Sequence, residues 1–197
     1  AYAAGARLNG AEIHRFTPVI GTEQNSDGTW NIRTEKGDIH TEWVVNAAGL
    51  WGREVGKMAD INLPLQPTEH QYFVTDTINE IKNLKNRLPS VADRDGEYYL
   101  RQEGKGLLIG AYEKNYKLWA EGETPKDFGH DLFDDDLERI EENVLRAIDR
   151  VPIAGSAGIK RVINGPMIWS PDSNVLFGPI PEIKNYICCN GVIPGFS

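Results

Sequence analysis

The chain has 197 residues and a formal net charge of −8; 40% of its residues are hydrophobic and 25% are charged. This length allows one sizeable core, or one core with a small second lobe, and the composition is ordinary for a globular domain. Because Lys and Arg form no basic stripe, nucleic acid is disfavoured as a partner. There is no apolar run of about 18 residues and no signal peptide, so neither a membrane span nor secretion is expected.

The only two cysteines, Cys188 and Cys189, are neighbours in the sequence. Neighbouring residues of a strand point to opposite faces, so a disulfide between them is not expected. Without a further cysteine or a His-rich cluster, the sequence suggests no metal site. This pattern fits a reducing compartment, either the bacterial cytoplasm or, if the source is a eukaryote, the mitochondrial matrix.

The first 60 residues read as the end of a helix followed by a β-meander. Residues 1–8 are small and tolerate a helix, and Asn9-Gly10 is a helix stop. Turn signals at Asp27-Gly28 and at residues 36–38 separate short β-like runs. The expected strands are residues 11–14, 18–23, 29–34, 38–40 and 43–46. A short helix is expected over residues 50–59.

The remainder alternates strands with one strongly predicted helix. We expect a long strand at residues 65–75, a hairpin of 98–102 with 107–112, and then a surface loop over 114–129. Apolar residues at helical spacing predict a helix over 133–151, and the acidic residues 134–136 at its start are expected to cap it. Further strands are expected at residues 160–169, 175–178 and 186–189. The chain then stops within a Gly-rich turn of the kind that leads into a helix, so we expect a fragment of a longer protein.

A strand that ends in small residues is the first feature with chemical meaning. Residues 44–51 read Val-Val-Asn-Ala-Ala-Gly-Leu-Trp. Small residues at this place let a ligand or a second backbone approach closely, and nucleotides bind at the carboxyl ends of strands in doubly wound folds. A tight strand-to-helix turn without a ligand explains the same residues. The segment alone leaves both interpretations open.

Several segments, in their order and spacing, resemble one family over nearly the whole chain. They are residues 44–51, the strand 67–75 with its His-Gln-Tyr, residues 98–103, 110–113, Asn-Gly-Pro at 164–166, Ser-Pro-Asp at 170–172 and Gly-Pro at 178–179. Together they resemble the D-amino-acid-oxidase-like FAD-dependent oxidoreductases, and among these the dimethylglycine and sarcosine dehydrogenases. The resemblance implies FAD as the cofactor and an N-methylated glycine as the substrate. It also implies hydride transfer from the N-methyl group to the flavin, giving an iminium that water hydrolyses to formaldehyde.

The same resemblance implies an α+β fold made of two lobes. Residues 1–62 and 163–197 are expected to form an incomplete α/β FAD-binding lobe, and residues 63–162 a mostly antiparallel β-sheet substrate lobe with a flanking helix. A Gly-x-Gly-x-x-Gly phosphate motif is absent, so this chain by itself is expected to bind FAD weakly or not at all. The family's histidine for covalent flavin attachment would precede Ala1, and a full-length parent can also carry a tetrahydrofolate-binding half.

His70 and Tyr98 are the expected catalytic residues. A lone histidine on an apolar strand is often structural, but the resemblance places His70 beside the flavin and the substrate. With an unperturbed pKa of ~6.5, its imidazole would help to deprotonate the substrate amine. Tyr98 and Tyr99 alternate across a strand, so only one can face a pocket, and the resemblance implies that Tyr98 orients the substrate. Arg101 is either a clamp for the substrate carboxylate or part of a surface salt bridge.

The resemblance also implies a set of cofactor contacts. The expected FAD-binding residues are Val19, Ala47, Ala48, Gly49, Trp51, Val192, Ile193, Pro194 and Gly195. Gly165, Pro166 and the turn at residues 170–172 are expected near the flavin ring, although Val175 departs from the family's usual proline. Two other functions stay open, namely oxidation of another small amino acid or amine, and a non-catalytic flavoprotein-like module for assembly or binding. The sequence does not indicate the electron acceptor.

Overall fold

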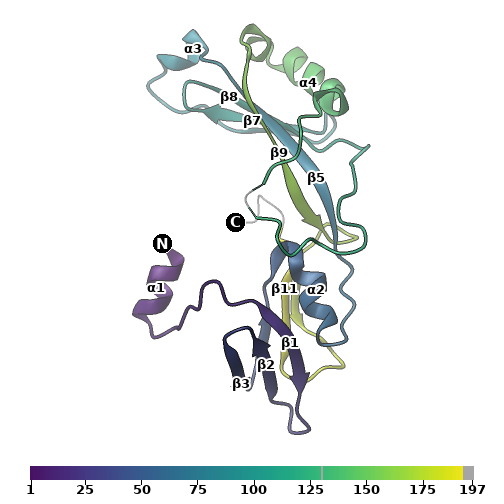
Figure 1. Ribbon diagram of the computed structural model, residues 1–197. Helices are drawn as coiled ribbons and strands as arrows, with labels where there is room; N and C mark the ends of the chain where they lie inside the picture. Colours follow the sequence, from purple (N-terminus) through teal and green to yellow (C-terminus); the bar gives the residue numbers. More distant parts are fainter. Residues whose placement is uncertain (130, 193–197) are drawn as a thin grey trace. The chain divides into compact units, whose positions relative to one another are not determined.

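The computed structural model describes residues 1–129 and 131–192, which form two compact units. The first unit comprises Ala1–Leu65 together with the chain from Ser170 onward, and the second unit is Gln66–Trp169. Figure 1 labels their helices and strands. Helices and largely antiparallel sheets occur in the one chain, so the predicted α+β class is confirmed.

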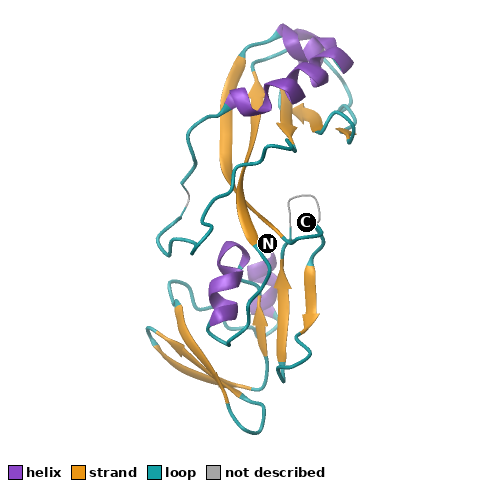
Figure 2. Cartoon of the chain, turned by 90° about the vertical axis from the view of Figure 1, so that its right-hand side faces the viewer, coloured by secondary structure: helices purple, strands orange, loops and turns teal. Residues whose placement is uncertain are grey.

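The first unit opens with helix α1 (Tyr2–Leu8), none of whose residues is buried, and continues into a meander. Strands β1 (Val19–Gln24), β2 (Trp30–Thr34) and β3 (Gly37–Thr41) pair antiparallel in sequence order. Figure 2 shows them as a sheet of their own. The turn from β1 to β2 uses Gly28 at φ +94°, a backbone conformation that residues with a Cβ rarely adopt.

Residues 11–14, which were predicted as a strand, have no regular structure. That prediction is wrong because an extended run becomes a strand only where a neighbour supplies its hydrogen bonds, and β1 is an edge strand that does not pair with it. The meander is attached through Trp30 instead. The Trp30 ring lies 5.5 Å from the ring of Tyr186, and its Nε1 donates to the Lys184 carbonyl at 3.1 Å.

A second sheet of the first unit joins distant parts of the chain. Strand β4 (Val44–Asn46) pairs in parallel with β11 (Tyr186–Asn190), which pairs antiparallel with β10 (Leu176–Pro179). β4 leads through a 3-10 turn (Gly49–Trp51) into helix α2 (Gly52–Lys57). The carboxyl ends of β4 and β11 therefore lie at the same edge of this sheet. Cys188 and Cys189 on β11 are both free thiols.

The second unit is built on a five-stranded antiparallel sheet. Its strands, in spatial order, are β6 (Val91–Asp93), β7 (Tyr98–Glu103), β8 (Gly106–Ala111), β5 (Gln66–Thr75) and β9 (Ile159–Trp169). β5 and β9 run side by side (Figure 1), and their register places His70 opposite Gly165. Residues 163–169, which we expected in the FAD-binding lobe, are thus the end of β9 in this unit, because the ladder with β5 continues to Trp169.

Helix α4 (Leu137–Arg150) lies against one face of this sheet (Figure 1), and the core of the unit lies between them. This core includes the buried residues Phe73, Leu100, Leu107, Ile109, Ile140 and Ala147. Helix α3 (Asn79–Lys82) and a 3-10 helix (Pro152–Ser156) complete the unit. Neither of these helices was predicted, and neither was β6.

Helix α4 begins at Leu137, four residues later than predicted, because the preceding chain runs alongside β9. The Phe133 N–H donates to the Asn164 carbonyl at 2.8 Å. Asp136 is the N-cap residue, but its side chain makes no capping bond, and its carboxylate accepts from Arg139 Nε at 3.1 Å instead. The expectation that this carboxylate caps the helix is therefore wrong.

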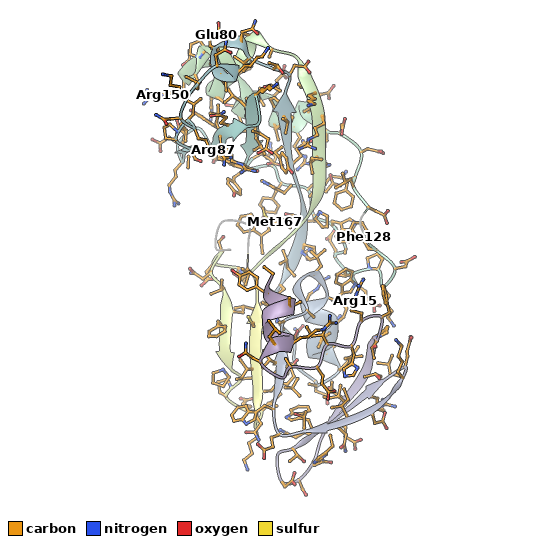
Figure 3. The ribbon with its side chains drawn as sticks, turned by 90° about the vertical axis from the view of Figure 1, so that its left-hand side faces the viewer. Arg15, Glu80, Arg87, Phe128, Arg150 and Met167 are labelled. Atoms are coloured by element: carbon orange, nitrogen blue, oxygen red, sulfur yellow. The ribbon has the colours of Figure 1, made fainter. Side chains whose placement is uncertain are left out.

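The loop before α4 is ordered by aromatic contacts. Trp119, Phe128 and Phe133 form a cluster with ring centroids 4.6, 5.2 and 5.8 Å apart. Figure 3 labels Phe128 of this cluster, together with the buried Met167 of β9. In the described part of the chain, no helix is both long enough and apolar enough to cross a membrane.

Candidate functional site

Strand alternation divides the side chains of the second unit between two faces of its sheet. On β5, Glu69, Gln71 and Phe73 point toward α4, whereas His70 and Tyr72 point away from it. We call the face opposite α4 the open face, and its aromatic members are His70, Tyr72, Tyr99, Tyr112 and Trp169. The strand register gathers these residues from four separate segments of the chain.

His70 is the polar centre of the open face. Its Nε2 lies 3.1 Å from the Tyr99 hydroxyl, which is hydrogen-bonding distance. Its ring stacks on that of Tyr112, with centroids 5.1 Å apart and planes inclined by 26°. Tyr112 also meets the edge of Trp169 at 6.2 Å, and Trp169 Nε1 donates to Thr68 Oγ1 at 3.0 Å. The imidazole is thus held between two tyrosines in a fixed orientation.

Gly110 makes room for the Tyr99 ring. The two residues are directly paired across β7 and β8, so any side chain at position 110 would stand on the same face as Tyr99. A Cβ there would lie 2.1 Å from Tyr99 Cζ and 2.3 Å from its hydroxyl oxygen. With glycine at position 110, the ring lies flat across β8 and its hydroxyl reaches His70.

Burial keeps the His70–Tyr99 pair uncharged at neutral pH. Loss of solvation, helped by the positive charge of Arg139, lowers the pKa of His70 to about 4. Burial likewise raises the pKa of the Tyr99 hydroxyl above its usual range, and that of Tyr112 is raised for the same reason. A neutral imidazole therefore faces a protonated phenol, and the proton on the hydroxyl can be donated to Nε2. We had expected an imidazole with an ordinary pKa, and that expectation is wrong for this environment.

Tyr98, expected to orient the substrate, lies on the other face of the sheet. It is 2% exposed and packs in the core with Ile140 and its neighbours beneath α4. The reason is alternation on β7: because Tyr98 faces α4, Tyr99 faces His70. Within the pair, Tyr99 and not Tyr98 therefore lies beside His70.

Arg101 forms a surface ion pair. Its guanidinium lies 3.4 Å from Glu103, and its side chain is 46% exposed. Of the two interpretations of Arg101, this geometry favours the salt bridge. The residues that sequence reasoning missed are Tyr99, Gly110, Tyr112 and Trp169. Tyr99 had a sequence signal, since alternation required one tyrosine of the pair to face away from the core.

In the first unit, the buried side-chain amides of Asn46 and Asn190 hydrogen-bond to the backbone around the small-residue segment Ala47–Gly49. Asn46 is 2% exposed; its Oδ1 accepts from the Ala48 N–H at 3.2 Å and its Nδ2 donates to the Gly52 carbonyl at 2.9 Å. Asn190 of β11 donates to the Asn46 carbonyl at 2.8 Å. Gly49 has φ +55°, and both Ala47 and Gly49 are exposed. A backbone presented in this way at the carboxyl end of parallel strands fits close approach by a dinucleotide.

The other expected cofactor contacts lie in the same unit at different places. Val192 follows β11 and is 46% exposed, and Trp51 ends the 3-10 turn. Val19 begins β1 in the meander sheet and is 36% exposed, so it is not a core valine. Ile193, Pro194 and Gly195 lie outside the described residues.

Comparison with known proteins identifies the family. A family model for DAO, FAD dependent oxidoreductase, matches residues 1–197. The chain belongs to this family. It is 46% identical over 191 residues to human mitochondrial dimethylglycine dehydrogenase, a match that covers 94% of this chain and 22% of that protein. Human mitochondrial sarcosine dehydrogenase is 38% identical, over 93% of this chain and 20% of its own length.

Solved structures show the same family likeness. The L-proline dehydrogenase from P. horikoshii superposes with a TM-score of 0.75 at 28% identity, covering 96% of this chain and 48% of the other. The resemblance to DAO-family flavoproteins that we drew from residue motifs is thereby confirmed. This chain spans about a fifth of the length of both dehydrogenases named above.

Proposed function

We propose that this chain is the substrate-side sheet and part of the FAD-binding lobe of an oxidoreductase that oxidises an N-methylated glycine, either dimethylglycine or sarcosine. The names of its 46% and 38% identical relatives support this substrate class. The observation that carries the proposal is the neutral His70–Tyr99 pair within an aromatic face. Since those relatives are named as mitochondrial, we propose the mitochondrial matrix if the source is a eukaryote.

The FAD would be held on its ring side by the segment Ala47–Gly49 and by the chain around Val192, with Trp51 and Val19 as further contacts. The exposed, amide-supported backbone after β4 fits this role. When bound, FAD supplies the two-electron oxidation. The chain's own contribution is to bind the amine, to fix its orientation and to set its charge.

The charge of the amine decides whether it can be oxidised. Hydride leaves the N-methyl carbon only when the nitrogen lone pair is free, so the substrate must react as the neutral amine. The burial and the Arg139 charge that lower the pKa of His70 would also lower the pKa of a substrate ammonium beside it. The open face thus favours the neutral, reactive form of the substrate amine, and the uncharged His70 adds no positive charge beside it.

His70 and Tyr99 would then orient the amine through hydrogen bonds. The neutral imidazole and the protonated Tyr99 hydroxyl, whose Nε2 and oxygen lie 3.1 Å apart, are uncharged hydrogen-bonding groups that can hold the neutral amine in place. The rings of Tyr112 and Trp169 offer apolar surface to the methyl groups. After loss of hydride from the methyl carbon, water adds to the iminium, and cleavage of the C–N bond releases formaldehyde.

The test uses the full-length flavoprotein and its visible spectrum. We expect anaerobic dimethylglycine or sarcosine to bleach the flavin band, and His70→Ala and Tyr99→Phe each to slow bleaching by roughly 10²–10³-fold. His14→Ala and Tyr116→Phe are matched controls, because both side chains are more than half exposed and lie outside the open face. A flavin-loaded protein that none of these amines reduces would overturn the proposal.

A further inference from the structure

We propose that Arg139 is a positioning residue, which holds β5 and the chain after β8 together so that His70 stacks on Tyr112. We call the ion bridge from Arg139 to Glu69 and Glu113 the clamp. Its relevance to catalysis rests on the proposed function, whereas the clamp itself can be tested without that function. Arg139 lies in the first turn of α4, on the opposite side of the sheet from the open face. Arg139 itself therefore does not contact a substrate bound on the open face.

A buried guanidinium joins three carboxylates at this point. The Arg139 side chain is 9% exposed. Its Nη2 lies 3.5 Å from Glu69, its Nε lies 3.1 Å from Asp136, and its Nη1 pairs closely with Glu113. Glu69 and Glu113 are themselves 7% and 5% exposed, so these charges are largely removed from water. Each carboxylate pairs with a different nitrogen of the planar guanidinium, whereas the three donors of an ammonium group all belong to a single nitrogen.

The clamp lies where the backbone ladder between β5 and β8 ends. The last paired residues are Tyr72 and Gly110. Continuing the same register would place His70 opposite Tyr112 and Glu69 opposite Glu113. Beyond this pair the Glu69 N–H donates to the Lys117 carbonyl at 2.8 Å, so the backbone of β5 no longer pairs with the chain that directly follows β8.

Arg139 joins Glu69 and Glu113 by an ion bridge where their two segments no longer pair through the backbone. Two carboxylates placed opposite each other across neighbouring strands repel and would spread the segments apart. With Arg139 between them, Glu69 and Glu113 are drawn together instead. Since Glu69 precedes His70 and Glu113 follows Tyr112, the bridge below the sheet fixes the 5.1 Å stack above it.

The neighbouring charged groups complete the local balance. Lys117 Nζ lies 2.8 Å from the other oxygen of Glu69, and Asn164 Nδ2 donates to Glu69 at 3.0 Å. Burial raises the pKa of Glu113, while the Arg139 charge opposes that rise. Counted as ionised, the cluster holds the carboxylates of Glu69, Glu113 and Asp136 against the cations of Arg139 and Lys117. Removal of Arg139 would leave two facing carboxylates with only one cation beside them.

The experiment compares Arg139→Lys with Arg146→Lys in the full-length flavoprotein. Arg146 lies seven residues further along α4 and makes an exposed ion pair with Glu142, so it controls for loss of a guanidinium from the same helix. The readouts on folded, flavin-loaded protein are the pKa of each histidine, from histidine hydrogen–deuterium exchange by mass spectrometry, and kcat and KM for the N-methyl amine. If Arg139→Lys does not fold, the double variant Arg139→Gln with Glu113→Gln removes the bridge without leaving the facing carboxylates.

We expect Arg139→Lys to raise the pKa of His70 by about one unit as its stack loosens. We also expect KM to rise about tenfold or more, with a smaller change in kcat. Arg146→Lys should change neither. An unchanged His70 pKa and KM in a folded Arg139 variant with a lower melting temperature would show a merely structural role and overturn the inference. A protein that no N-methyl amine reduces would refute the proposed function alone, and the His70 titration would still decide the clamp.

Discussion

Gly110→Ala tests the geometry of the open face directly. A methyl group there would stand 2.1 Å from Tyr99 Cζ, 2.3 Å from its hydroxyl oxygen and 2.5 Å from Cε1. Ordinary carbon–carbon contacts are about 3.5 Å or longer, so the ring must move by roughly 1.4 Å. That movement carries the hydroxyl beyond hydrogen-bonding distance of His70, from which it is now 3.1 Å away.

The expected cost follows from these two effects. Forcing a methyl group into a packed site costs about 1–3 kcal/mol, and the lost hydrogen bond adds about 0.5–1.5 kcal/mol. We therefore expect Gly110→Ala to lower the free energy of unfolding by about 2–4 kcal/mol, measured by chemical denaturation. Histidine hydrogen–deuterium exchange followed by mass spectrometry should show a changed pKa for His70 and no change for the exposed His14.

Gly165→Ala is the matched control for these structural readouts. Gly165 is also a strand glycine on the open face, directly opposite His70, but a methyl group there would meet only Leu132 at 3.6 Å, an ordinary contact. Removing the ring in Tyr99→Ala should make the added methyl group at position 110 almost free of cost. If the two glycine variants unfold alike, or if the cost persists without the Tyr99 ring, the packing argument fails.

Four further predictions concern single groups. His70 has a folded pKa of about 4 and an unfolded pKa of ~6.5, so the unfolded state binds the proton first as the pH falls. The free energy of unfolding should therefore decrease between about pH 6.5 and about pH 4, by up to about 3 kcal/mol. Chemical denaturation of His70→Gln should lack this part of the pH dependence, and a slope identical to that of the unmodified protein would contradict the prediction. Tyr98→Ala should cost about 3–5 kcal/mol because the ring is in the core, whereas Tyr99→Phe should cost about 1 kcal/mol and act mainly on flavin reduction; melting curves and reduction rates separate the two. Asp136→Ala should destabilise the protein more than Asp135→Ala, since only Asp136 pairs with Arg139, and equal unfolding midpoints would argue against this. Gly49→Ala should cost about 1–2 kcal/mol through its positive φ and weaken flavin retention, which is checked by FAD released per protein on filtration.

Much of the local structure followed from patterns within the sequence. Alternating residues and turn signals predicted β1, β2, β3, β5, β7 and β8 near their observed bounds, and apolar residues at helical spacing predicted α4. Where prediction failed, a distant segment decided the outcome. The run at 11–14 lacks a partner strand, and the start of α4 moved because Phe133 bonds to the backbone of β9.

The sequence by itself determined the family, the α+β class and the rule that Tyr98 and Tyr99 must face opposite ways. Only the tertiary structure decided which of them meets His70. Alternation is a property of the extended backbone and needs no partner. The choice of face depends on which side of the sheet α4 covers, and on a register that brings Gly110 under the Tyr99 ring and Arg139 between Glu69 and Glu113. Such contacts join residues that lie on different strands or helices, and no pattern within one segment records them.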